Sequence, residues 1–162
     1  MIYMKYGDGK AIKGDVTEPG HQDWIELQTV QFGIGRLITG TVGSMKNREA
    51  TGQPTLSEIT ISKTLDSSSP LLFQDALINK KAVPIEIDFT RTGQKEPYLK
   101  LTLKEVLLAA YSLGGSAGGS ESENLTLNFA YIEYAHSTMK TDGSGESSNK
   151  VIFDLTKGVP TK

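Results

Sequence analysis

A serine between two glycines is the pattern in this chain that comes closest to catalytic chemistry. Gly114-x-Ser116-x-Gly118 has the spacing of a hydrolase nucleophile elbow, in which the serine stands on a sharp turn between a strand and a helix. The residues beyond it, GSESEN, lead into an alternating segment and not into a helix. A Ser–acid–His triad would need His136 and an acid from the same short stretch. We therefore interpret residues 114–122 as a Gly/Ser connection and predict that the chain is not an enzyme.

Other patterns that could bind a ligand are weak. The glycine-rich run fits no phosphate-binding motif. His21 stands beside Asp23 and Trp24, which favours a structural hydrogen bond over a metal ligand. Glu86 and Asp88 share one face of an alternating segment, which we interpret as a solvated face. Cysteine is absent, which excludes disulfides and cysteine zinc sites. We expect no catalytic residue, no metal and no cofactor.

Charge and hydropathy argue against two classes of partner. The chain has 162 residues, a net charge of −2 and a pI of about 5.7, so no strong field attracts it to nucleic acid or to an anionic membrane. No apolar run approaches the length of a membrane span, and the N-terminus lacks the pattern of a signal peptide. We predict a single domain over residues 1–162, with no nucleic-acid partner, no membrane insertion and no signal peptide.

Alternation of apolar and polar residues with period two dominates the chain and predicts half-buried strands. The change of parity between Leu27 and Val30 predicts a bulge near Gln28–Thr29. Residues 105–113, EVLLAAYSL, contain helix formers, but we predict a strand because they continue a strand pattern. An Asp-Gly turn within residues 140–150 predicts a long hairpin. The alternating segments are residues 2–6, 25–27, 30–34, 58–62, 85–90, 99–104, 125–131 and 151–155.

One segment, residues 66–81, breaks the strand pattern. Ser69 is the predicted N-cap of a helix, and Pro70 fits its first helical position. The apolar spacing predicts one short amphipathic helix over about 69–80, whose apolar stripe packs on the sheets. That stripe consists of Leu72, Phe73, Ala76 and Leu77.

The segment 35–54 is longer than most structureless connections within a compact domain. It holds four glycines, one proline and several charged residues. Long loops of this kind are often functional, so we predict a functional loop with an apolar stem and a charged tip. The stem residues are Leu37, Ile38 and Val42, and the tip residues are Lys46, Arg48 and Glu49.

A set of short marks follows a fixed order along nearly the whole chain. They are a Lys-Gly-acid step, a His followed by Trp-Ile-Glu, a Lys-x-x-Asp before Ser-Pro-x-Leu, a Tyr-Leu strand and a Gly-rich loop. In this order the chain resembles the haemolysin-coregulated proteins (Hcp), the tube subunits of the bacterial type VI secretion system. The stretches are IKGDVTEPGHQDWIEL at 12–27, ITISKTLDSSSPLLFQDAL at 59–77, YLKLTLKEVLLAAYSLGGSAGG at 98–119 and ENLTLNFAYIEYAH at 123–136. The chain departs from the family at Asp15 and Val16, where Glu-Ser is usual, and in its last strand, VIFDL, where an aromatic residue is common.

The resemblance implies a mainly β fold: two antiparallel sheets forming a squat β-barrel with one short flanking helix. It implies homohexameric rings that stack into a tube, which a contractile sheath drives out of the cell. The sheath, spike and baseplate proteins are then partners, and small effector proteins are carried in the lumen. The implied location is the bacterial cytoplasm before assembly, followed by secretion through the type VI system.

The resemblance also implies two functional surfaces. In the family the strand around Val30 and Phe32 lies on the inner wall of the ring. Gln31 lies between these two apolar residues and must point to the opposite face, so we predict that it contacts cargo, together with Thr29. For the long loop we predict a role in ring stacking.

Two other function classes stay open from the residues alone. A monomeric β-sandwich binding or adhesion module would explain the composition but not the ordered marks. A small hydrolase would require Ser116 to react with a serine-directed probe. The mass in solution separates the ring from the monomeric module, because a ring subunit forms hexamers.

Overall fold

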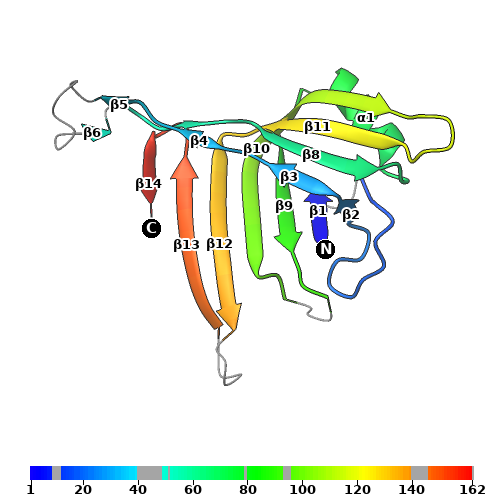
Figure 1. The fold of residues 1–162 in the computed structure, drawn as a ribbon, viewed down its shortest axis with the longest axis horizontal. Helices are drawn as coiled ribbons and strands as arrows, with labels where there is room; N and C mark the ends of the chain where they lie inside the picture. The colour runs from blue at the N-terminus through cyan, green and yellow to red at the C-terminus, as the bar shows by residue number, and fades with distance from the viewer. Residues whose placement is uncertain are drawn as a thin grey trace.

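The computed structural model of the chain describes residues 1–8, 12–39, 49–50, 52–78, 80–92, 96–139 and 146–161. Within them the fold consists of antiparallel β-sheets and one short helix (Figure 1). The predicted fold class, mainly β with two antiparallel sheets and one helix, is confirmed. Bent strands join the two sheets around one core.

The two sheets share one long strand, β10 (Leu99–Gly114). In spatial order the first sheet contains β2 (Ile25–Leu27), β1 (Ile2–Tyr6), β9 (Val83–Phe89), the first half of β10, β12 (Tyr131–Met139), β13 (Glu146–Asp154) and β14 (Val159–Thr161). The second sheet contains β3 (Thr29–Gln31), β8 (Ile59–Thr64), β11 (Ser122–Asn128) and the second half of β10. The predicted hairpin is the β12–β13 pair, and residues 140–145 between these strands lie outside the described residues.

Two bends carry the chain from one sheet to the other. Residues 99–106 of β10 pair in the first sheet and residues 107–114 pair in the second, with the bend at Glu105, whose φ of 53° is left-handed. This strand includes residues 105–113, so the strand prediction there is confirmed. The second bend lies at Gln28, between β2 and β3, where the N–H of Gln28 donates to the Ser62 carbonyl at 2.8 Å. The predicted change of parity is therefore a corner of the fold.

The core fills the space between the two sheets. Alternation predicts most of it, but it fails after Phe129, where the chain turns from β11 into β12 and the parity changes. Ile132 is buried in the core, whereas the predicted Tyr131 is only half-buried. Fully buried members of the core include Met4, Ile25, Ile59, Ile61, Leu72, Ile85, Ile87, Leu101, Leu103, Leu125 and Leu127.

The helix α1 (Ser69–Ile78) forms where the sequence predicts it, but its burial differs from the prediction. Ser69 is the first helical residue, because the Ser68 carbonyl accepts the N–H of Leu72 and makes Ser68 the N-cap. Leu72 is fully buried, whereas Phe73 is 49% exposed and Leu77 is 65% exposed. The predicted packing of the apolar stripe on the sheets is thus confirmed only in part: Leu72 fills the contact, the Phe73 ring meets Tyr111 of β10 edge-on with ring centroids 5.5 Å apart, and Leu77 points to solvent.

The described residues of the segment 35–54 form part of a two-stranded arm and not a structureless loop. Its base pairs β4 (Ile34–Gly35) with β7 (Thr55–Leu56), and its outer part pairs β5 (Ile38–Thr39) with β6 (Glu49–Ala50). Figure 1 shows this arm extending beyond β14. Leu37 and Ile38 of the predicted stem are exposed. Glu49 lies in β6, and the predicted residues Val42, Lys46 and Arg48 lie outside the described residues.

Candidate functional site

The outer face of the second sheet carries the two residues predicted to contact cargo. In β3, Val30 packs against the core, so Thr29 and Gln31 point to the other side, where both are exposed. Thr29 pairs with Ser62 on β8, and Gln31 pairs with Thr60. The register continues this face across β11 and β10. We call its residues the polar face: Thr29, Gln31, Thr60, Ser62, Ala110, Ser112, Asn124 and Thr126.

The polar face combines hydroxyl and amide groups and carries no formal charge. The Thr29 and Ser62 hydroxyl oxygens lie 2.6 Å apart, within hydrogen-bond distance. Hydroxyl and amide side chains can each donate and accept, so such a face can bind varied partners. A charged residue enters only at its border, where Asn128 donates to the Glu58 carboxylate at 2.9 Å. Sequence reasoning found Thr29 and Gln31 but not their neighbours, because only the register brings the four strands together.

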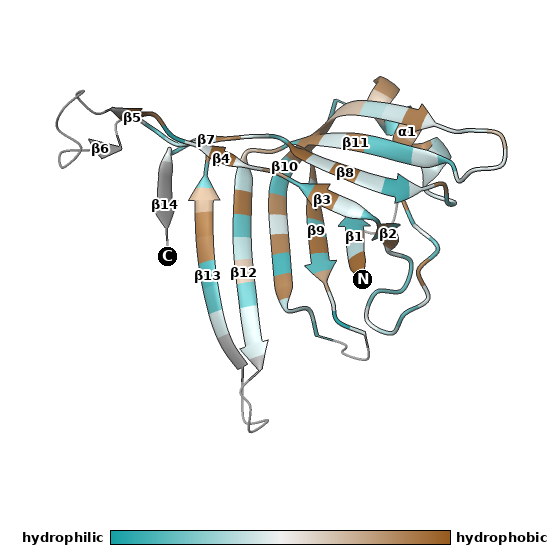
Figure 2. Cartoon of the chain, viewed as in Figure 1, coloured by the Kyte–Doolittle hydropathy of each residue, from teal (hydrophilic) through white to brown (hydrophobic). Residues whose placement is uncertain are grey.

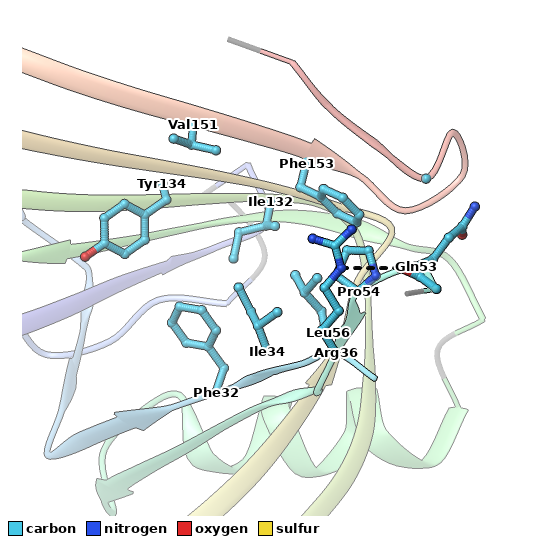
Figure 3. Close-up of a pocket in the computed structure, with 12 residues that line it drawn as sticks. Phe32, Ile34, Arg36, Gln53, Pro54, Leu56, Ile132, Tyr134, Val151 and Phe153 are labelled. Atoms are coloured by element: carbon cyan, nitrogen blue, oxygen red, sulfur yellow. Dashed lines mark hydrogen bonds between the residues drawn. The ribbon is translucent and has the colours of Figure 1, made fainter. Parts of the chain in front are cut away.

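A second surface feature is an apolar groove of about 620 Å³ at the base of the arm. Figure 3 shows side chains from three parts of the chain pointing into it: from β3–β4 and β7, from β12 and from β13. Arg36 is its one charged lining residue, and its Nε donates to the Gly52 carbonyl at 3.3 Å. The other lining residues include Phe32, Ile34, Pro54, Leu56, Ile132, Tyr134, Val151 and Phe153.

Comparison with known proteins identifies the family. A protein-family model described as "Type VI secretion system effector, Hcp" matches residues 3–136. The chain belongs to the Hcp family. Protein hcp1 of Pseudomonas aeruginosa is 33% identical over 90 residues, which cover 54% of this chain and 56% of that protein. The chain therefore spans little more than half the length of this curated relative.

Solved structures agree with the fold of this Hcp chain. It is similar to "Structure of a type six secretion system protein", with a TM-score of 0.84 at 20% identity, covering 99% of this chain and 98% of the other. It is also similar to Hcp1 from Salmonella typhimurium, with a TM-score of 0.77 at 19% identity, covering 99% and 97%. At these identities the likeness concerns the fold.

The structure explains the first of the Hcp marks, the Lys-Gly-acid step, through a junction between the loop 12–24 and the start of α1. A Cβ atom at Gly14 would lie 2.3 Å from the Trp24 carbonyl oxygen, so only glycine fits in the Lys-Gly-acid step. The next residue, Asp15, accepts the N–H of Ser67 at 3.1 Å and the Ser67 hydroxyl at 2.5 Å. These bonds lower the pKa of Asp15. The mark therefore fastens this loop to the segment that begins α1.

A third mark, Lys-x-x-Asp before Ser-Pro, forms a buried ionic network beneath α1. Lys63 and Glu123 are both fully buried, with Nζ and Oε2 2.5 Å apart. Lys63 Nζ also lies 2.9 Å from Asp66. The Ser69 hydroxyl donates to Glu123 at 2.7 Å, and the Tyr111 hydroxyl donates to its other oxygen. The sequence could have predicted this pair. Lys63 alternates with the buried Ile61 on its strand, and Glu123 alternates with the buried Leu125 on its strand.

The pKa values in this network follow from burial and hydrogen bonding. Burial acts to raise the pKa of Glu123, but hydrogen bonds from Lys63, Tyr111 and Ser69 outweigh it and hold the pKa below its ordinary value. Burial, with the bond to the Glu123 carboxylate, raises the pKa of Tyr111 to about 12. Glu123 is therefore ionised at neutral pH and Tyr111 is protonated.

The His-Trp mark forms a second buried polar contact, on the outer side of the first sheet. His21 is buried, and its Nε2 lies 3.0 Å from Asp88 Oδ2. The rings of Tyr3 and Trp24 pack against the imidazole, with centroids 4.8 and 4.7 Å away. The predicted structural role of His21 is supported, but a solvated face for Asp88 is wrong: the loop 12–24 covers it, and this burial raises its pKa.

The remaining chemical candidates do not assemble into a catalytic site. Ser116 is exposed in the connection after β10, and its carbonyl accepts the N–H of Gly119. The strand β11 follows and not a helix, as the elbow pattern would require. His136 pairs with Leu99 in the first sheet, whereas the elbow serine follows the second-sheet half of β10. Among the described residues, no three His, Asp or Glu side chains are grouped to hold a metal ion.

No helix among the described residues combines the length and the apolar character needed to cross a bilayer.

Proposed function

We propose that this Hcp chain is a structural tube subunit of a bacterial type VI secretion system. Six copies form a ring, rings stack into the secreted inner tube, and the lumen carries effector proteins. The sheath, spike and baseplate proteins of the system are its partners. The subunit is made in the cytoplasm and leaves the cell through the system itself. The chain performs no catalysis in this role.

The observation that carries this proposal is the family match over residues 3–136, together with a fold that resembles solved Hcp structures along nearly the full chain. A structural role also agrees with the chemistry of the described residues. Their buried charged groups are paired with one another inside the fold, at Lys63–Glu123 and at His21–Asp88, and not gathered in a cleft. Such pairs hold elements together and leave no reactive group at the surface.

The polar face supplies the lumen wall in this proposal. It is broad because four strands contribute to it, and its lack of formal charge suits contact with effectors of differing charge. Weak hydrogen-bonding contacts also suit a carrier that must release its cargo. Gln31 and Thr29 are the proposed cargo-contacting residues.

The arm supplies the ring-stacking contact. Its exposed apolar residues Leu37 and Ile38 extend beyond the sheets, where they can reach a neighbouring ring. Its outer residues Val42, Lys46, Arg48 and Glu49 belong to the same proposed contact. Removing residues 43–50 is expected to leave single rings intact while tube formation and secretion are lost. Long tubes from the deletion variant would remove this role from the arm.

The mass in solution tests the ring directly. Light scattering of the purified chain at micromolar concentration is expected to give six times the subunit mass of 17.6 kDa. Electron microscopy of the same sample should show closed rings. A monomer would contradict the proposal and would favour a solitary binding module.

Charge on the polar face tests the lumen role. Gln31→Arg places one cation in each subunit on that face, so captured effector is expected to fall at least tenfold while rings still form. Gln22→Arg, at an exposed glutamine in the loop 12–24, is the matched control and should keep wild-type capture. Equal capture by both variants would remove Gln31 from the cargo surface. Loss of the ring in Gln31→Arg alone would mean that this face is a subunit contact.

A further inference from the structure

The apolar groove at the base of the arm has the size and the lining of a small-molecule site. Its volume of about 620 Å³ lies within the range of about 300–1,000 Å³ that is usual for ligand pockets. Three of its large side chains are open to solvent: Ile34, Tyr134 and Val151 are 67%, 41% and 53% exposed. Figure 2 shows apolar colouring on the part of β13 next to the arm. The subunit therefore leaves a concave apolar surface accessible.

Polar groups are few in this groove. Among its described lining residues, the amide of Gln53 and the hydroxyl of Tyr134 are the uncharged polar side-chain groups. A peptide would bring a backbone N–H and a C=O with almost every residue, and each such group costs free energy when it is buried without a partner. An alkyl chain has no such groups and gains free energy when apolar surfaces cover it. The lining therefore suits an alkyl chain better than a peptide.

Arg36 adds one positive charge to the lining. Its Nε donates to the Gly52 carbonyl at 3.3 Å, as the dashed line in Figure 3 marks. Among the side chains that the structure describes, no carboxylate pairs with Arg36, and the side chain is exposed. A guanidinium has five N–H donors and can hold both oxygens of one carboxylate. An exposed cation on an apolar groove complements a ligand with an anionic head and an alkyl tail.

We propose that the groove binds a single-chain fatty acid. The carboxylate of the ligand pairs with the terminal nitrogens of Arg36, and its alkyl chain covers Ile34, Tyr134 and Val151. The groove shares no residue with the polar face, so this site is separate from the proposed cargo surface. The inference thus goes beyond the tube role and gives the chain a second kind of ligand.

Titration calorimetry of the full chain tests the site with dodecanoate as the probe. One dodecanoate is expected to bind per subunit. Butanoate has the same head and should give no measurable binding, because it lacks most of the apolar tail. Dodecyltrimethylammonium has the same tail with a cationic head, so it should bind at least about tenfold more weakly. Equal binding of the anionic and the cationic amphiphile would overturn the proposal.

Variants test the two parts of the groove. Arg36→Gln removes the charge and should weaken dodecanoate binding about tenfold, the usual loss for one charge-assisted contact. Arg91→Gln, at an exposed arginine outside the groove, is the matched control and should bind as the wild type does. Val151→Asp places a carboxylate beside the alkyl chain and should abolish binding. Val151 is exposed, so the circular dichroism spectrum should stay unchanged. Equal affinities of the two arginine variants would overturn the assignment of the head to Arg36.

A second copy of the chain and a lipid surface are the competing occupants. Light scattering of the titrated sample tests the first. Binding that occurs only with a fall of the mass to one subunit would mean that the groove is a subunit contact, and would overturn the proposal. Vesicles of phosphatidylglycerol test the second. Sedimentation of the chain with these vesicles, without binding of free dodecanoate, would overturn it as well.

The mass also separates this inference from the proposed function. A hexamer that binds dodecanoate at unchanged mass supports the site and the ring. A hexamer that binds none overturns the site while the tube role stands. A monomeric wild type that binds dodecanoate supports the site and contradicts the ring, and a monomer that binds none contradicts both.

Discussion

The two ends of α1 reverse the usual distribution of polar and apolar residues. At its N-terminal end, Ser69 is buried and donates to the buried carboxylate of Glu123. At its C-terminal end, Leu77 and Ile78 are mostly exposed. Buried polar groups need partners, and the N-terminal end finds all of its partners within the chain. Within the described residues, the apolar side chains Leu77 and Ile78 at the C-terminal end are left mostly exposed, so the two ends of one helix are held to the fold very differently.

The difference between the two ends of α1 separates residues that stabilise the subunit from residues that do not. The ionic network holds α1 on the second sheet, through Lys63 on β8 and Glu123 on β11. Breaking this network on one side should destabilise the subunit. The exposed side chains of Leu77 and Ile78 contribute little to the subunit, so replacing them should leave its stability almost unchanged. The experiments below test this separation, from the largest expected effect to the smallest.

Breaking the ion pair on one side should have the largest effect. Glu123→Leu leaves the Lys63 ammonium buried without its main partner, and removing one member of a buried pair costs about 3–5 kcal/mol. Asp66, 2.9 Å from Lys63 Nζ, still pairs with the ammonium group, so we expect a loss of unfolding free energy of about 3 kcal/mol, the lower end of that range. Urea unfolding at one fixed protein concentration measures the change.

The matched control removes both charges. Lys63→Met with Glu123→Leu replaces the pair by apolar side chains, which is often neutral, so the double variant should be more stable than Glu123→Leu alone. If the double variant instead loses as much as the two single variants together, the charges act independently and the network reading is wrong.

Two leucines of α1 sharpen the comparison, because they differ in burial but not in chemistry. Leu72→Ala removes a fully buried side chain and should cost about 2–4 kcal/mol of unfolding free energy. Leu77→Ala removes an exposed one and should change the stability of the subunit by less than about 0.5 kcal/mol. Equal stability losses for the two variants would contradict this difference between the two ends of α1.

The sequence predicts which segments are strands better than it predicts which side chains of those strands are covered by other parts of the chain. Period-two alternation correctly indicates the strand at 105–113 and the change of parity at Gln28, because side-chain direction follows from the backbone alone. It predicts Asp88 as solvated, and that is wrong because the distant loop 12–24 covers this residue. Helical spacing predicts the stripe of α1 as packed, and that fails at Leu77, which is 65% exposed while Leu72 is fully buried. Alternation specifies the face of the strand to which a side chain points, and the tertiary fold decides whether another segment covers that face.

Local sequence patterns also predict only part of the polar face and of the apolar groove. Gln31 could be assigned to the outer face from Val30 and Phe32 alone. The width of the polar face depends on the pairing of β3 with β8 and of β8 with β11, which alternation does not specify. The groove depends on segments more than 90 residues apart, such as Ile34 and Val151. No local pattern contains that information.

Acid should loosen the N-terminal end of α1 and leave its apolar C-terminal end unaffected. Glu123 has a pKa below its ordinary value of 4.5 in the folded chain, so its contribution to stability is complete above about pH 4.5. That contribution is lost as the pH falls through the lower folded value. The unfolding free energy of the wild type should therefore decrease more steeply below pH 4.5 than that of Lys63→Met with Glu123→Leu, which lacks the titrating group. Asp88, whose pKa is raised, is present in both proteins and cancels in the difference. Urea titrations from pH 7 to pH 3 measure both curves, and parallel curves over this interval would mean that Glu123 does not fasten the helix through its charge.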